Sequence, residues 1–109
     1  MTEPEEVARE LDRVADRLRV VAPRYAARGT PDAEAALEGV RAAVQGLADL
    51  AADAEGLPHR PMPRLAPHAL PDQVLVLGHD LLASAGGTVP AGPELRAGHA
   101  LLVELRRRL

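Results

Sequence analysis

The amino-acid sequence predicts an all-α protein with a four-helix bundle-like fold, and three observations carry that prediction. Apolar residues recur at helical spacing over two long segments and two shorter ones. Ala, Leu and Val supply almost all of the 47% hydrophobic residues. Proline and glycine gather between these segments, where they end or begin helices. We therefore expect residues 1–109 to form a single helical domain that contains a long helical hairpin, a proline-rich strap and two shorter helices.

The segment 31–55 is the longest run without an interior proline, and it predicts the central helix. Thr30 can cap its first turn through the side-chain oxygen, and Pro31 suits the first helical position. Gly56 provides the stop, with Pro58 just beyond. Its apolar residues fall on one face at 100° per residue, so this face should be covered by other helices. They are Ala33, Leu37, Val40, Val44, Leu47 and Ala51.

The segment 3–28 predicts a helix with a narrower apolar seam. Pro23 removes one backbone donor, so we expect a kink near that residue rather than an end, because Tyr25 continues the seam beyond it. A seam of two residues per heptad suits packing against a single neighbouring helix, and we expect the helix over 31–55 to be that neighbour. The seam residues are Val7, Leu11, Val14, Leu18, Val21 and Tyr25.

A proline-rich strap is expected over residues 56–71. Its five prolines disfavour both a helix and a central strand, so the backbone should be extended. The strap also carries apolar side chains, such as Leu57, Met62 and Leu65, which are unusual in a free tether. We therefore expect the strap to lie across the bundle.

Two shorter helices are expected over 72–85 and 93–108. Residues 73–78 could equally form a buried strand, but no second strand is available to pair with it, which favours the helix. Gly86 and Gly87 should end the first of these helices, and 89–93 should form a turn. Arg106, Arg107 and Arg108 lie where the dipole of the last helix favours positive charge.

Composition excludes several classes of function. The chain has no cysteine, which excludes disulfides and thiolate metal sites, and its net charge of −3 argues against general nucleic-acid binding. The acidic N-terminus is unlike a signal peptide, and no apolar run is long enough to span a membrane, so we expect a cytoplasmic protein. The absence of Lys, Asn, Ile and Phe indicates a GC-rich, bacterial genome.

One hypothesis from the sequence is a metal site. His79, Asp80 and His99 are the candidate ligands, and they define the alternative function of a small helical metal-binding protein or metal-dependent enzyme. The pair His79-Asp80 resembles the paired ligands of the HD-type metal hydrolases. Those enzymes need further His and Asp ligands, and no Asp follows residue 80. The favoured interpretation has no cofactor and no metal.

The favoured hypothesis is association through the outer face of the helix over 31–55. Ala35, Gly39, Ala42 and Gly46 form a strip of small residues opposite the apolar face. Interior glycine costs a helix about 1 kcal/mol relative to alanine, so two glycines in one strip indicate close approach of another backbone. We therefore expect a non-enzymatic interaction or scaffold protein that binds a second copy of itself or another protein. A solvent-exposed strip enriched in glycine by mutational bias is the alternative.

Overall fold

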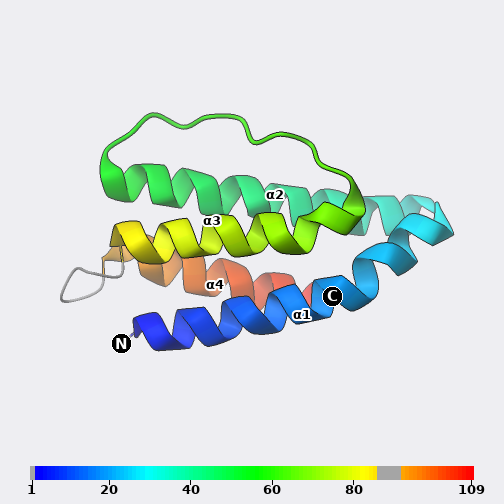
Figure 1. Cartoon of the computed structure of the whole chain (residues 1–109), viewed down its shortest axis with the longest axis horizontal. Coiled ribbons are helices and arrows are strands. Elements are labelled where there is room, and N and C mark those ends of the chain that lie inside the picture. The colour runs from blue at the N-terminus through cyan, green and yellow to red at the C-terminus, as the bar shows by residue number, and fades with distance from the viewer. Residues whose placement is uncertain (1, 86–91) are drawn as a thin grey trace.

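The computed structural model describes residues 2–85 and 92–109, and in these residues it contains four α-helices and no strand. The helices are α1 (Pro4–Arg28), α2 (Pro31–Glu55), α3 (Leu70–Ala85) and α4 (Pro93–Arg108) (Figure 1). The predicted all-α class is confirmed, and residues 73–78 are helical rather than a strand. The expected stop at Gly86 and Gly87 and most of the expected turn over 89–93 lie outside the described residues.

Local chemistry explains where the long helices begin and end. Thr30 Oγ1 accepts a hydrogen bond of 3.2 Å from the backbone N–H of Ala33, as a capping side chain does. Gly29 and Gly56 end α1 and α2 with φ values of 62° and 69°, in the left-handed region that favours glycine. The α1–α2 connection is therefore confined to Gly29 and Thr30.

The start of α3 corrects the expected extent of the strap. A 3₁₀ helix, Pro67–Ala69, leads directly into α3 at Leu70, so only residues 57–66 are extended between α2 and this helical segment. Pro67 and Pro71 occupy first-turn positions, where the missing backbone N–H would have no helical partner. The expectation that the extended strap continues to residue 71 was therefore wrong.

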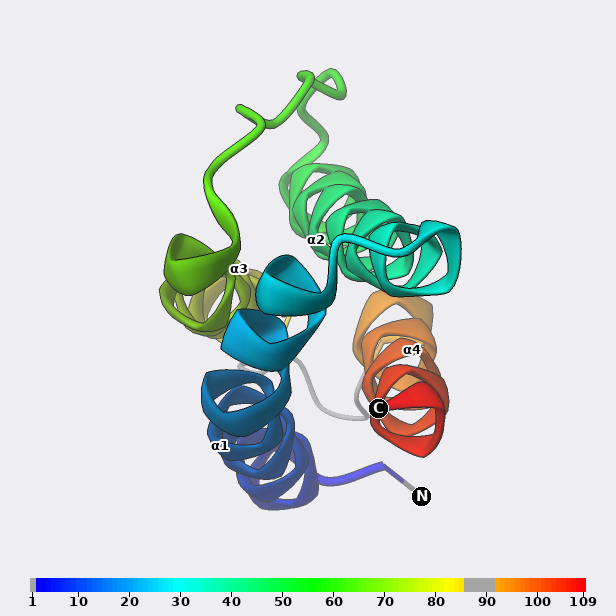
Figure 2. The same ribbon diagram turned by 90° about the vertical axis from the view of Figure 1, so that its right-hand side faces the viewer.

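The arrangement of the helices differs from the expected hairpin packing. α1 and α2 run in opposite directions but lie diagonally across the bundle, and each packs mainly against α3 and α4 (Figures 1 and 2). The strap returns along the bundle, so α3 runs in the same direction as α2 (Figure 1). The seam of α1 is buried mainly against α3 and α4, so the prediction that α2 is its single neighbouring helix was wrong.

α1 continues through Pro23, and Figure 1 shows its last turns bending toward the start of α2. Its first half carries Glu10, a buried charged residue whose carboxylate forms ion pairs with Arg106 of α4 and, at 3.5 Å, with Arg13. Arg17 Nη2 also donates a hydrogen bond of 2.9 Å to the carbonyl oxygen of Leu109. These contacts fix the end of α4 against α1.

Close helix approach replaces aromatic packing in the core. Leu11 of α1 occupies the space where a Cβ of Gly78 in α3 would lie. In the same way, Leu81 of α3 occupies the space where a Cβ of Gly98 in α4 would lie. A Cβ on Gly46 in α2 would come within 2.7 Å of the Cδ1 methyl of Leu101 in α4. Leucine–glycine contacts therefore connect α1 to α3, α3 to α4, and α4 to α2. A glycine at each contact lets a whole leucine side chain fit between two helices.

Candidate functional site

The strap is held on the surface of α2 by side chains one turn apart. Gln45 Nε2 donates a hydrogen bond of 3.0 Å to the carbonyl oxygen of Arg60, and Gln45 Oε1 accepts one of 2.8 Å from the N–H of Met62. Arg41 Nη2 donates a third bond of 3.0 Å to the carbonyl oxygen of Leu65. These bonds satisfy backbone groups that an isolated extended segment would leave to water.

Further contacts hold the second half of the strap. Gln73 Nε2 of α3 donates a hydrogen bond of 3.1 Å to the carbonyl oxygen of Pro63. Arg64 forms an ion pair with Glu38 of α2. The hydrogen bond from Arg64 lowers the pKa of Glu38 and raises the pKa of Arg64 itself. The strap is therefore held by both helices that it crosses.

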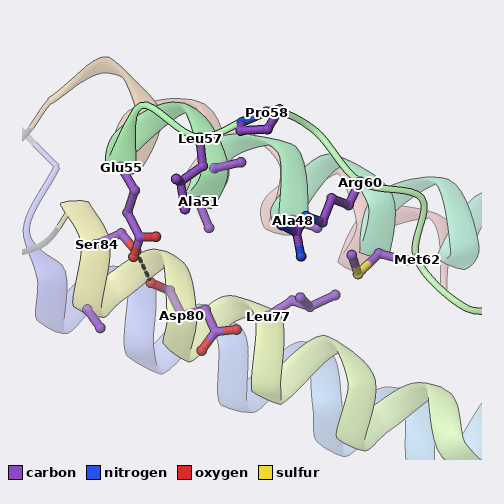
Figure 3. A pocket seen from close by; sticks show the side chains of 12 residues that line it. Ala48, Ala51, Glu55, Leu57, Pro58, Arg60, Met62, Leu77, Asp80 and Ser84 are labelled. Carbon is purple, nitrogen blue, oxygen red and sulfur yellow. Dashed lines mark hydrogen bonds between the residues drawn. The ribbon is translucent and has the colours of Figure 1, made fainter.

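A groove of about 470 Å³ lies between α2, α3 and the first half of the strap (Figure 3). Small side chains of α2 and Leu77 of α3 line one part of it, and the strap contributes its apolar residues and Arg60. The lining residues are Ala48, Ala51, Ala52 and Glu55 of α2, Leu57, Pro58, Arg60 and Met62 of the strap, and Leu77, Asp80, Ala83 and Ser84 of α3.

Acidic and basic side chains lie in different parts of the groove. Figure 3 shows Glu55 and Ser84 at one end and Arg60 farther along the strap. Ser84 Oγ lies 2.7 Å from Glu55 Oε1 and 2.8 Å from the carbonyl oxygen of Asp80, so its one proton can serve one acceptor at a time. Within residues 2–85 and 92–109, neither the Asp80 carboxylate nor the Arg60 guanidinium forms an ion pair. Both charges are therefore available to a ligand.

Our interpretation of the sequence did not identify this groove. Two rows of side chains at helical spacing line it, and the signal in the sequence was the placement of Ala48, Ala52 and Glu55 on one flank of α2. Leu77, Asp80 and Ser84 form the matching flank of α3. Neither flank lies at the centre of an apolar face, and nothing in the sequence indicates that the strap brings them together.

His59 connects the strap to the last turns of α2. Its Nε2 lies 2.6 Å from Asp53 Oδ1, and its Nδ1 lies 3.6 Å from Asp49 Oδ1. The hydrogen bond to Asp53 is the main cause that raises the pKa of His59, and the charge of Asp49 acts in the same direction. The contact is therefore strongest when the imidazole is protonated.

We expect the stability that His59 provides to depend on pH. Because the pKa of His59 is higher in the folded chain, its contact stabilises the fold fully at pH values below the unfolded-state pKa of about 6.5. This stabilisation is lost as the pH rises through the folded-state pKa. Urea unfolding at about pH 5.5 should therefore show the wild type more stable than His59→Gln, and the difference should shrink by about pH 8.5. A difference that is constant or grows with pH would contradict the assignment.

The structure does not assemble the metal site that the sequence suggested. Over the described ranges, no group of three or more His, Cys, Asp or Glu side chains is placed to hold a metal ion. His79 is exposed on α3, and His99 is half-buried on α4, which lies diagonally opposite α3 in the bundle (Figure 2). Asp80 lines the strap groove instead. His79, Asp80 and His99 therefore do not form the expected set of ligands.

The strip of small residues on α2 is divided by α4. Gly46 faces Leu101 of α4 and is used in packing within the chain. Ala35 and Ala42 are exposed, and a Cβ on Gly39 would meet nothing within 4 Å. The structure thus leaves the first three residues of the predicted strip open and covers the fourth.

A surface hollow of about 240 Å³ lies where this open part meets α4. Gly39 and Ala42 line it from α2, while Leu101 and Leu105 line it from α4. Glu104 and Arg108, which form an ion pair at 3.1 Å, lie at the same hollow. The hollow offers apolar surface beside a helix face without large side chains.

None of the described helices is long and apolar enough to cross a membrane. No protein-family model matches the chain, and no curated protein or solved structure shows significant similarity to it.

Proposed function

We propose that this chain is a small, non-enzymatic interaction protein of the cytoplasm that associates with a second copy of itself through the outer face of α2. The contact surface comprises Ala35, Gly39 and Ala42 together with the hollow beside α4. Gly46, the fourth residue of the predicted strip, acts indirectly by fixing α4 next to this surface.

The open space beside Gly39, in the interior of α2, is the observation that carries the proposal. An interior glycine costs a helix about 1 kcal/mol relative to alanine. Gly46 offsets this cost by accommodating Leu101, but Gly39 makes no comparable contact within the chain. A second helix lying against Gly39 could approach more closely than any larger residue would permit. The adjoining hollow would receive an apolar side chain of that helix.

A second copy is the partner that the pattern fits. A two-fold interface uses the same patch on both chains, so the patch must be complementary to itself. Ala35 and Ala42 flank Gly39 on the same side of α2, one turn before it and one turn after it. Antiparallel pairing about Gly39 would place small residues opposite small residues. Residues 1–55 carry twelve acidic and seven basic groups, or −5, and residues 56–109 carry four and six, or +2, which adds a weak attraction between copies.

Sedimentation velocity over a series from low to high micromolar concentration tests the proposal. We expect a dimer for the wild type and a monomer for Gly39→Glu, because a charged side chain would prevent close approach. Leucine at Gly46 is unsuitable as a test, because it would collide with Leu101. Far-UV circular dichroism checks that the variant stays helical.

Val76→Glu is the matched control. Val76 is 59% exposed on α3. Helix α3 lies on the other side of the bundle from α4 (Figure 2). This variant should dimerise as the wild type does. A monomeric wild type at high micromolar concentration would overturn the homodimer. If Val76→Glu is monomeric and Gly39→Glu remains dimeric, the interface lies on α3 instead.

A further inference from the structure

We infer that the groove beneath the strap binds a short apolar peptide with free termini, of two to three residues. The peptide ammonium group contacts Asp80, its carboxylate contacts Arg60, and its side chains lie on the apolar residues between them. This site is separate from the α2 surface proposed for dimerisation, and the inference does not depend on that proposal.

Charge is the first argument for this ligand. A groove of about 470 Å³ lies within the range of about 300–1,000 Å³ that small-molecule sites occupy. It holds two carboxylates, Glu55 and Asp80, and one guanidinium, Arg60. Ser84 already donates toward Glu55 Oε1, whereas Asp80 and Arg60 form no ion pair with described residues. A ligand with opposite charges at its two ends would pair with both of them.

Length is the second argument. Figure 3 shows Glu55 at one end of the groove and Arg60 extending from the strap toward the part of α2 around Ala48. Glu55 and Ala48 are seven residues apart on α2, which corresponds to about 10 Å along the helix axis. An extended chain covers about 3.3–3.6 Å per residue, so a tripeptide spans the same length.

The apolar lining is the third argument. Between the charged ends the groove presents Ala51 and Leu77 from the two helices and Met62 from the strap. Alanine leaves room above α2, and Leu77 and Met62 are both half-buried, so each still offers apolar surface. Methionine adapts its shape to different side chains. The lining therefore favours small aliphatic side chains without specifying one of them.

Gln45 is the positioning residue of this site. Its amide accepts from the N–H of Met62 and donates to the carbonyl oxygen of Arg60, so one side chain fixes both strap residues over the groove. Prolines at 58, 61 and 63 limit the freedom of the strap before binding. The wall of the groove is therefore formed before the ligand arrives.

Heteronuclear NMR titration of the full chain with the tripeptide Ala-Leu-Ala tests the inference. Saturable shifts are expected at amides that line the groove. Peptides that are N-acetylated or C-amidated should each bind about fivefold more weakly, since each lacks one ionic contact with exposed protein groups. Asp80→Asn should weaken the free peptide about fivefold but leave the acetylated peptide unchanged. Arg60→Gln should weaken binding of the free peptide about fivefold and leave binding of the amidated peptide unchanged.

Two further variants complete the test. His79→Gln changes an exposed neighbour of Asp80 that does not line the groove, and it should bind all three peptides as the wild type does. Gln45→Ala should weaken all three alike, because it loosens the strap without removing a charge. The inference is overturned if millimolar peptide gives no saturable shifts at the groove. It is also overturned if Asp80→Asn weakens the acetylated and free peptides equally.

Discussion

Val14→Glu should leave the chain largely unfolded at 25 °C. Val14 is fully buried in the seam of α1, where it belongs to the core shared with α3 and α4. An ionised carboxylate without a partner in this core should cost more than about 4 kcal/mol, which approaches the total stability of a small domain. Far-UV circular dichroism and urea unfolding measure the result.

Val20→Glu is the control on the same helix. Val20 is 46% exposed, so this substitution introduces the same side chain into water. Its effect should stay within about 0.5 kcal/mol of the wild type. Comparable losses in the two variants would show that the seam of α1 is not covered within one chain.

Gly78→Ala and Gly39→Ala should change stability in opposite directions. At Gly78 the new methyl group would overlap Leu11, which has no exposed surface into which it could move, so a loss of about 1–3 kcal/mol is expected. At Gly39 no atom of the same chain lies within 4 Å of the added Cβ, so the better helix propensity of alanine should stabilise the monomer by up to about 1 kcal/mol at concentrations too low for dimerisation. The midpoints of urea unfolding give both values.

The double variant Gly78→Ala with Leu11→Ala identifies the cause of the loss at Gly78. If the overlap with Leu11 is the cause, shortening Leu11 removes it, and the combined loss should be smaller than the sum of the single losses. Strictly additive losses would indicate that Gly78 matters for another reason. Stabilisation by Gly78→Ala alone would contradict the close approach of α1 and α3.

The helix boundaries were predictable because their signals are local. Thr30 as a cap, Gly29 and Gly56 as left-handed stops, and Pro31 at a first-turn position all act within a few residues of the chain. The all-α class follows from the same local periodicity. The exception was the segment 67–71, where the prolines were assigned to the strap although Pro67 and Pro71 begin helical turns.

The pairing of the helices was not predictable in the same way. Burial of apolar surface has no preferred direction, so the seam of α1 could be covered equally well by any apolar helix. The structure selects α3 and α4, and Leu11 against Gly78 shows how shape decides between partners. A glycine in the sequence does not show which side chain will pack against it, because the leucine that does so is distant along the chain.

The sequence by itself determined where this chain is helical, which face of each helix is apolar, and where the chain is extended. Only the tertiary structure decided that α1 and α2 lie diagonally, that α4 covers Gly46 but not Gly39, and that a groove forms beneath the strap. The physical reason is that an extended segment covers more distance per residue than a helix does. An extended residue advances about 3.1 Å and a helical residue about 1.5 Å, so residues 57–66 can return along about twenty helical residues. This return makes α3 parallel to α2, and it brings Asp80 and Arg60 to the same groove.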